Sequence, residues 1–408
     1  MTRDADSDTI LNLVQTEGPA GAAILERLLP PELAPLFDAE FVGLHLLYDE
    51  FIFRLVLQVI RDAALEPAMR EPGDAAEIAA RAGLAAAQAV VPLDWMLRLL
   101  AARGLAEERR DGGAVRYRLS GALPALDPAP VREEQRRRRP SWLPAYTLAE
   151  TVARDYPAFL RGEVTGEEVL FSPRRLRLWI DYFSNDNGLY VVNNRLGALA
   201  VERWLPRQGS VILELGGGLG SGAAALLERL DSGERAGAIA EYRFTEFVPA
   251  FLRRGEQALR GRPAGRARIT YGALDMNRAF AEQGVAAGSV SVVYAVNTLH
   301  VAHDLLMTLG EVLRALEPDG RLVVTECVRT GARRPIESEF VFNLTETFRS
   351  PRLHPLYRPG GGFLTPAQWR AALEAAGFAD VRFLPDIERV QERAPRFIVA
   401  AITAARPG

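Results

Sequence analysis

A histidine and a glutamate each close a run of apolar residues in this sequence. His300 follows SVSVVYAVN, residues 289–297, and Glu326 lies near the end of RLVVTEC, residues 321–327. Both runs are predicted strands of a parallel sheet, and neighbouring strands would bring the imidazole beside the carboxylate at their carboxyl ends. A carboxylate fixes the tautomer of a histidine and stabilises its cation, so this pair could act as a general base.

A second feature is the glycine-rich stretch VILELGGGLGSGAAALLERL, Val211–Leu230, in which five of seven consecutive residues are glycine. The apolar run before the glycines predicts a buried strand, and Ala223–Leu230 predicts a helix directly behind them. Glycine accepts positive φ and lets a ligand approach the main chain, while the helix N-terminus offers N–H groups to an anion. The glycines leave two ligands open: a dinucleotide, read as G-x-G-x-x-A at Gly218, Gly220 and Ala223, or S-adenosylmethionine.

An acidic residue inside the predicted strand favours the second ligand. Glu214, Gly216, Gly218 and Gly220 spell E-x-G-x-G-x-G, which resembles the first motif of class I methyltransferases. The resemblance implies S-adenosylmethionine as cofactor. It also implies an α/β fold, Rossmann-like, with a mostly parallel seven-stranded sheet.

Further cofactor-binding residues are expected where later strands end. Glu246 closes EYRFTEF, Glu241–Phe247, where a carboxylate can accept hydrogen bonds from both ribose hydroxyls. The family pattern places Asp275 at the adenine amino group and Met276 against the ring, at the end of a third strand, Ile269–Met276. The predicted cofactor-binding residues are Glu214, Gly216, Gly218, Gly220, Glu246, Asp275, Met276 and Asn297.

Between Glu214 and Cys327 the resemblance becomes narrower. The segments FTEFVPAFL, LDMN and AVNTLHVAHDLLMTLGEVLRALEPDGRLVVTE resemble methyltransferases of polyketide assembly lines. In the C-methylating domains of that family, a histidine in N-x-L-H and a glutamate after the fifth strand form the catalytic dyad, which His300 and Glu326 match. Small-molecule O-methyltransferases carry a similar pair in an H-D-W segment, but Val301 and Ala302 follow the histidine here. Methylation of oxygen and of carbon both stay open.

Metal chemistry is not expected at this histidine. Of the four histidines, only His303 is close to His300 in sequence, and no third ligand is evident. Cys327 is the only cysteine, which excludes an intrachain disulfide and a cysteine-rich metal site.

The N-terminal part predicts helices followed by a hairpin. Residues 30–66 carry apolar residues at helical spacing, and Asp74–Ser120 predicts helix, turn, helix and then a hairpin around Asp111, Gly112 and Gly113. This winged-helix pattern resembles the N-terminal dimerisation domain of the O-methyltransferases that include plant caffeate and bacterial antibiotic enzymes. The resemblance implies a homodimer and favours an oxygen acceptor. DNA recognition is disfavoured, because only Asp94 and Arg98 are charged between residues 85 and 102.

Two further regions are candidates for acceptor binding. The aromatic-rich stretch 141–205 contains an asparagine cluster, which suits a pocket wall or, equally, turns and helix caps. An insertion at residues 329–362 either covers the acceptor or forms an apolar cover helix. The predicted acceptor-binding residues are Tyr190, Asn194, Phe340, Phe342, Asn343, His354 and Tyr357.

Length and composition fit this organisation. A chain of 408 residues with 48% apolar and 25% charged residues predicts two or three globular domains. We expect a helical, winged-helix-like dimerisation domain at 1–140, a helical connector and pocket lid at 141–205 and the cofactor-binding domain at 206–408. The run Arg136–Arg139, after a proline-dotted stretch, predicts a solvated linker. A net charge of −3 gives no case for a nucleic-acid or membrane surface, and without a signal-peptide pattern or a membrane-length apolar run the expected location is cytoplasmic.

The sequence therefore predicts an S-adenosylmethionine-dependent methyltransferase that O-methylates an acidic hydroxyl or enol of a polyketide-like molecule, free or carrier-bound. C-methylation of an activated carbon is the nearest alternative. A nucleotide-dependent oxidoreductase and a ligand-sensing winged-helix regulator are the others.

Ligand binding separates these classes of protein. We expect S-adenosylhomocysteine, and not NADPH, to bind the purified chain in isothermal titration calorimetry, because Glu214 favours the methyltransferase reading of the glycines. Binding of NADPH alone would contradict this expectation. A gel shift with DNA would favour the regulator.

Overall fold

Seven strands form one sheet in the computed structural model, which describes residues 5–111, 114–205, 209–231, 235, 237–261 and 267–408. The strands are β3 (Ser210–Leu215), β4 (Ile239–Thr245), β5 (Arg268–Gly272), β6 (Val290–Val296), β7 (Leu316–Cys327), β8 (Ala379–Leu384) and β9 (Val399–Ala405). Their order is β5-β4-β3-β6-β7-β9-β8, and only β9 runs antiparallel to its neighbours. Every residue of β6 is buried, as expected for a strand covered on both faces. The predicted fold, a mostly parallel Rossmann-like sheet, is confirmed.

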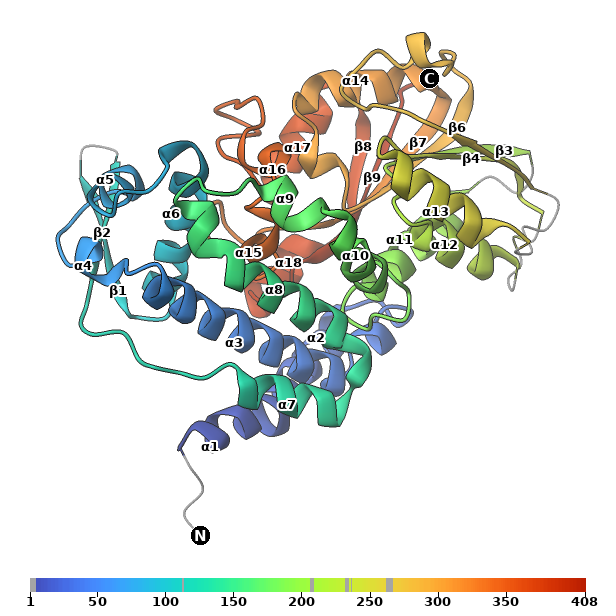
Figure 1. Ribbon diagram of the computed structural model, residues 1–408. Coiled ribbons are helices and arrows are strands. Elements are labelled where there is room, and N and C mark those ends of the chain that lie inside the picture. Colours follow the sequence, from blue (N-terminus) through green and yellow to red (C-terminus); the bar gives the residue numbers. More distant parts are fainter. Residues whose placement is uncertain (1–4, 112–113, 206–208, 232–234, 236, 262–266) are drawn as a thin grey trace. The chain divides into compact units, whose positions relative to one another are not determined.

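The helices of this sheet lie on both of its faces. The chain moves from β3 toward β5 and then returns to β6 and β7, so right-handed crossovers put α12 and α13 on one face and α14 on the other. In Figure 1, α12 packs with α11 and with α13, whereas α14 packs with α17. These elements are α11 (Val191–Trp204), α12 (Ser221–Asp231), α13 (Pro249–Leu259), η5 (Ala281–Gln283), η6 (Leu299–Val301), α14 (Leu305–Ala315), α17 (Pro366–Ala375) and α18 (Ile387–Arg393).

By its contacts the chain divides into two compact units. The first comprises Met1–Arg27, Pro35–Tyr182 and Gly331–Arg349, and the second comprises Leu28–Ala34, Phe183–Thr330 and Ser350–Gly408. The sheet of seven strands lies in the second unit. The division into three segments at 140 and 205 stays a prediction about domain organisation.

The first unit is mainly helical. Its longest helix, α3, begins behind Asp38, whose side chain accepts a hydrogen bond from the Phe41 amide, and packs beside α8 (Figure 1). Tyr146 of α8 contacts the ring of Phe51 with centroids 4.4 Å apart. The helices are α1 (Ala5–Asn12), η1 (Leu13–Glu17), α2 (Gly18–Leu28), η2 (Ala34–Phe37), α3 (Ala39–Asp62), α4 (Glu66–Met69), α5 (Ala75–Arg81), α6 (Ala86–Ala102), α7 (Ala129–Arg138), η3 (Pro140–Trp142), α8 (Leu143–Leu160), α9 (Gly166–Phe171), η4 (Pro173–Arg175), α10 (Leu176–Tyr182), α15 (Glu339–Phe342) and α16 (Glu346–Arg349).

The segment with the winged-helix pattern forms two helices and two strands. Asp74 and Glu77 make a capping box that starts α5, and α6 follows after a short turn. Strands β1 (Ala106–Asp111) and β2 (Ala114–Leu119) pair antiparallel, while the predicted turn residues Gly112 and Gly113 lie outside the described residues. A helical N-terminal region is confirmed, and its winged-helix character stays a prediction.

The linker predicted at Arg136–Arg139 is wrong for most of its length. Arg136, Arg137 and Arg138 belong to helix α7. Glu133 contacts Arg136 at 2.5 Å, and Glu134 contacts Arg138 at the same distance, so glutamates one helical turn away screen the arginines from each other.

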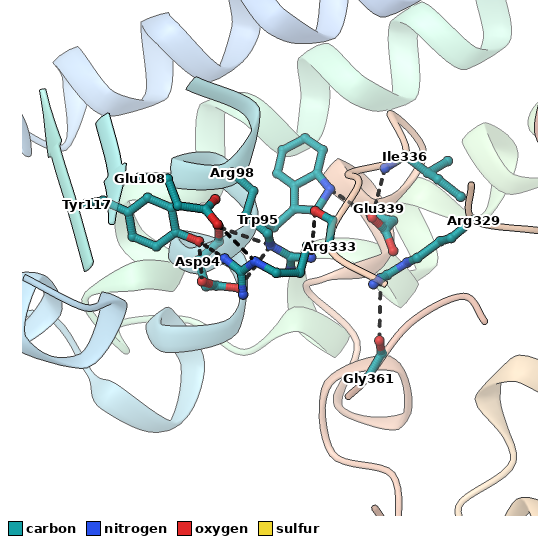
Figure 2. A network of polar contacts seen from close by, with 10 residues as sticks. All are labelled: Asp94, Trp95, Arg98, Glu108, Tyr117, Arg329, Arg333, Ile336, Glu339 and Gly361. Atoms are coloured by element: carbon teal, nitrogen blue, oxygen red, sulfur yellow. Dashed lines mark hydrogen bonds and ion pairs between the residues drawn. The ribbon is translucent and has the colours of Figure 1, made fainter. Parts of the chain in front are cut away.

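The segment Gly331–Arg349 follows β7 in the chain yet packs within the first unit. Figure 2 shows Glu339 accepting hydrogen bonds from the Trp95 indole and the Ile336 amide, both at 2.9 Å. Arg333 reaches Glu108 at 3.4 Å and also bonds the Tyr117 hydroxyl. Helix α6 and the β1–β2 pair thus hold the insertion through polar contacts.

Within the described residues, no single helix is both long and apolar enough to cross a membrane; by length and composition only, the bent pair α5 and α6 could do so.

Gly197 allows α11 to lie against the sheet. A Cβ at this position would lie 2.6 Å from both the Thr325 hydroxyl oxygen and the Tyr294 hydroxyl oxygen. We expect Gly197→Ala to lower the free energy of unfolding by about 1–3 kcal/mol, because the helix must move away from the sheet. Urea denaturation measures the change.

Gly310 is the matched control, because it also lies inside a helix and its added Cβ would meet only the Arg314 guanidinium at 3.9 Å. Gly310→Ala should stabilise by about 0.5–1 kcal/mol, since alanine is the better helix former. Equal effects of the two substitutions would show that no close approach exists at Gly197.

Candidate functional site

The glycine-rich turn joins the end of β3 to the start of α12. Gly216, Gly218 and Gly220 have φ of 59°, 57° and 83°, a region that favours glycine. At Gly216 a Cβ would also lie 2.4 Å from the Thr298 methyl group. Thr298 follows β6, so this turn touches the neighbouring strand end, a contact that the sequence did not predict.

Glu246 follows β4 directly and supports the same turn. Its Oε2 accepts a hydrogen bond from the Gly218 amide at 2.9 Å, and its Oε1 accepts one from the Val248 amide at 2.7 Å. Burial raises the pKa of this carboxyl, although the backbone donors oppose the shift. The structure therefore shows Glu246 shaping the turn, and its contact with a ribose stays a prediction.

Glu214 and Asn194 present buried acceptor atoms at the turn. Within the described residues, no donor meets Glu214 Oε2 or Asn194 Oδ1 at hydrogen-bond geometry, although both side chains are buried. The Tyr242 hydroxyl also interacts with the Glu214 carboxyl and opposes part of the rise in its pKa. A Cβ on Gly222 would lie 3.1 Å from Glu214 Oε1 and 3.7 Å from Asn194 Oδ1, which places the two side chains together. Burial raises the pKa of Glu214 to about 8. Two such acceptors suit an ammonium group, and the first turn of α12 suits a carboxylate, so the residues present fit the amino-acid end of S-adenosylmethionine.

Asn185 fixes the amide group of Asn194. Asn194 Nδ2 donates to Asn185 Oδ1 at 2.7 Å, and Asn185 Nδ2 donates to the Ser221 carbonyl at 2.9 Å. This chain of hydrogen bonds links α11 to the start of α12 and orients Asn194 Oδ1.

The residues predicted for adenine lie in a loop. Strand β5 ends at Gly272, so placing Asp275 and Met276 within the strand was wrong. Asp275 Oδ1 accepts a hydrogen bond from the Asn277 amide at 2.9 Å, and Asn277 Oδ1 accepts one from the His303 amide at 2.7 Å. Asn277, which the sequence analysis missed although it quoted LDMN, ties this loop to the segment that carries His300. The roles of Asp275 and Met276 stay predictions.

His300 and Glu326 are in direct contact. His300 Nδ1 lies 2.7 Å from Glu326 Oε2, and the His300 amide donates to Glu326 Oε1 at 3.3 Å. The side chains are 4% and 0% exposed, and the Phe363 ring packs against the imidazole at 4.5 Å between centroids. A carboxylate at Nδ1 favours the tautomer that carries the proton on that nitrogen. The adjacency predicted from strand order is present, and catalysis by the pair stays a prediction.

Asn297 and Tyr190 lie at the same edge of the sheet. Asn297 has a φ of 48°, which is uncommon outside glycine. Its backbone N–H donates a hydrogen bond to the Thr325 carbonyl at 2.7 Å. Its side-chain oxygen accepts from the Cys327 amide at 3.2 Å, and its side chain also hydrogen-bonds the Tyr190 hydroxyl. Burial raises the pKa of Tyr190, so this hydroxyl stays protonated.

The residues predicted to bind the acceptor divide between the two units. In the first unit Phe340 is buried against Tyr156, Phe342 contacts Trp179 and Tyr182, and Asn343 is buried. In the second unit the His354 ring stacks on Tyr357 with centroids 3.8 Å apart. Acceptor contact stays a prediction for all of them and for Tyr190 and Asn194.

One segment of the chain matches a known protein family. Residues 213–322 match the family model described as a methyltransferase domain. The chain is 30% identical over 245 residues to highly reducing polyketide synthase 2 of Gibberella zeae and 28% identical over 246 residues to polyketide synthase PksR of Bacillus subtilis. Each match covers 59% of this chain but only 9% of the relative's length.

Two solved structures share the fold over nearly the whole chain. The CurJ carbon methyltransferase superposes with a TM-score of 0.73 at 22% identity, covering 98% of this chain and 99% of the other. The DszA carbon methyltransferase gives a TM-score of 0.69 at 24% identity, with 96% of both chains covered. The chain therefore contains a segment that matches a methyltransferase domain, and it has the predicted methyltransferase fold over nearly its whole length.

Glu214 should make the stability of the ligand-free protein fall with pH. Its pKa rises from 4.5 to about 8 in the folded chain, so between these values the folded state binds a proton that the unfolded state has lost. Stability falls across this window, and Glu214→Gln removes this part of the fall. The variant should therefore gain melting temperature over the wild type progressively from pH 5 to pH 8, measured by scanning fluorimetry.

Glu282→Gln is the control, because Glu282 is an exposed glutamate of the same unit. The raised pKa of Glu246 also makes stability depend on pH, but it does so equally in every variant. Its contribution therefore cancels when the variants are compared. Parallel curves for Glu214→Gln and the wild type would contradict the proposed protonation of Glu214.

Proposed function

We propose that this chain methylates an acidic carbon of a polyketide-like acyl acceptor, with His300 as the base. The observation that carries the proposal is the buried 2.7 Å contact between His300 Nδ1 and Glu326 Oε2, at the carboxyl ends of two parallel strands. Thr298, which lies two residues before the histidine, touches the glycine-rich turn.

The cofactor is proposed to bind along that turn. When bound, S-adenosylmethionine supplies an electrophilic methyl group. Glu214 Oε2 and Asn194 Oδ1 would hold its ammonium group, and the first amides of α12 would hold its carboxylate. Glu246 accepts from the ribose, and Asp275, Met276 and Asn297 complete the site.

His300 removes the proton from the acceptor. Glu326 accepts a hydrogen bond from the N–H at Nδ1. It also stabilises the imidazolium that forms when Nε2 takes up the proton of the acceptor. A carbon flanked by a ketone and a thioester is acidic, because its carbanion is delocalised as an enolate. Water is excluded around the buried pair, so its charges act more strongly than they would in solution.

Carbon is preferred as the accepting atom because the fold matches two carbon methyltransferases over nearly their full length, and the curated relatives are polyketide synthases. This changes the preference for oxygen that the N-terminal pattern suggested. An acidic hydroxyl or enol oxygen stays the second candidate, supported by the helix, turn, helix and paired strands at α5, α6, β1 and β2. A carrier-bound acceptor and a homodimer are also proposed, the latter testable by analytical ultracentrifugation.

Labelled methyl transfer tests which atom accepts. The purified chain is incubated with S-adenosylmethionine that carries a ¹³C methyl group and with the N-acetylcysteamine thioester of acetoacetate. The proposal predicts a ¹³C methyl signal coupled to the α-proton of the thioester in carbon-correlated NMR. A labelled methoxy signal would instead establish the oxygen acceptor.

Substitution of the base tests the proposed mechanism. We expect His300→Ala to reduce methyl transfer by about 10²- to 10⁴-fold, because no other group takes the proton, while S-adenosylhomocysteine affinity stays unchanged. Calorimetry gives the affinity and the labelled assay gives the rate.

His303→Ala is the matched control, since His303 is exposed in the same segment and its backbone, not its ring, hydrogen-bonds Asn277 and Arg352. It should retain wild-type turnover. Full turnover of His300→Ala would exclude His300 as the base.

A further inference from the structure

Arg358 is a buried arginine that lies against the His300 segment and that the mechanism above does not use. Its side chain has no exposed surface, and its Nη2 donates to the His300 carbonyl at 2.5 Å. The backbone of Arg358 pairs with that of His354 in both directions, which closes a tight loop and fixes the arginine at its base.

The burial of this guanidinium group is costly. Within the described residues, Arg358 Nε and Nη1 have no hydrogen-bond partner. An unpaired buried donor costs about 1–3 kcal/mol, and more on a charged group. A methionine would fill the same length without that cost, so packing alone does not account for an arginine at this position.

The charges around Arg358 come from several elements. Glu326, on β7, attracts the guanidinium, whereas Arg329, just beyond β7, repels it. Arg329 itself donates to the Gly361 carbonyl at 3.4 Å, in the glycine-rich run after Arg358 (Figure 2). Burial lowers the pKa of Arg358 to about 10, so the group is still a cation at neutral pH.

Other groups near His300 and Glu326 have smaller effects on the charge of the pair. The Tyr190 hydroxyl and Cys327 are near Glu326, but the tyrosine stays protonated. Phe363 covers the imidazole with an apolar ring. Asp304 and Arg352 form an ion pair at 2.6 Å in the same region, where the arginine is 73% exposed and therefore screened by water.

We propose that Arg358 is a positioning residue for the base: its cation keeps Glu326 ionised and, through the bond to the His300 carbonyl, holds the imidazole where Nδ1 meets the carboxylate. The proposal rests on His300 being the base. Arg358 does not touch the acceptor. It acts by keeping the proton on Nδ1 and the lone pair on Nε2.

The sign of the effect follows from the charges. A buried cation beside the pair opposes the uptake of a proton by either member. Without Arg358, the pair takes up that proton at higher pH, whichever residue then carries it. The base would consequently be lost to protonation over a wider pH range.

The test measures titration of His300 without an acceptor. The full chain is labelled with ¹⁵N-histidine, its four imidazoles are followed by NMR as pH changes, and His300→Gln assigns the signal of interest. We expect Arg358→Gln, which keeps N–H donors but removes the charge, to move the midpoint of this titration upward by about one pH unit. Arg358→Lys, which keeps the charge, should stay close to the wild type.

Arg352→Gln is the matched control, because it removes an exposed arginine six residues away and should leave the midpoint unchanged. An Arg358→Gln midpoint equal to the wild-type value, in a variant that still binds S-adenosylhomocysteine, would overturn the proposal. If that variant does not fold, Arg358→Met replaces it and is read by the same two outcomes.

Failure of this inference is distinguishable from failure of the proposed function. Full methyl transfer by His300→Ala would show that His300 is not the base, whatever the titration shows. Loss of transfer in His300→Ala together with unchanged titration in the Arg358 variants would overturn only the role of Arg358.

Discussion

The parallel register of β6 and β7 is the constraint on which the site depends. Val296 pairs with Thr325, so the chain leaves β6 opposite Glu326. The positive φ of Asn297 and the short helix η6 then turn His300 back onto the carboxylate. Side chains alternate between the faces of a sheet, and Thr325 faces Gly197 of α11. A slip of one residue would therefore put the carboxylate under that helix and a threonine beside the histidine.

Several polar side chains at this edge of the sheet are buried although some of their atoms have no hydrogen-bond partner among the described residues. Glu214 and Asn194 keep acceptor atoms without partners in the described structure, and Arg358 keeps donor atoms. Such atoms cost stability in the ligand-free protein, so each needs a reason. For the two acceptors the proposed reason is a cationic ligand, which would replace a protonated carboxyl with a paired carboxylate. For the arginine it is the carboxylate of Glu326, reached through space.

Sequence was sufficient for features set by local pattern and strand order. The glycines behind a buried strand predicted the turn, and the usual order of an open α/β sheet predicted that His300 meets Glu326. Features that depend on hydrogen bonds between residues far apart in the sequence were missed. Asn277 draws Asp275 into a loop, and Glu339 holds an insertion to Trp95 from 244 residues away. The arginines of α7 were misread because their pairing with glutamates one turn earlier needs a helix that the prolines argued against.

In the proposed mechanism, the arrangement of charges accounts for proton transfer in a buried site. Before the reaction, the positive charge of Arg358 offsets the Glu326 carboxylate, and the buried Arg329 adds a second positive charge nearby. When His300 takes a proton, the positive charge on the imidazole forms together with a negative charge on the acceptor. Proton transfer thus separates charge over a short distance without adding net charge to a site from which water is excluded. In the proposed role of Arg358, its positive charge disfavours a further positive charge on the pair until an acceptor is present.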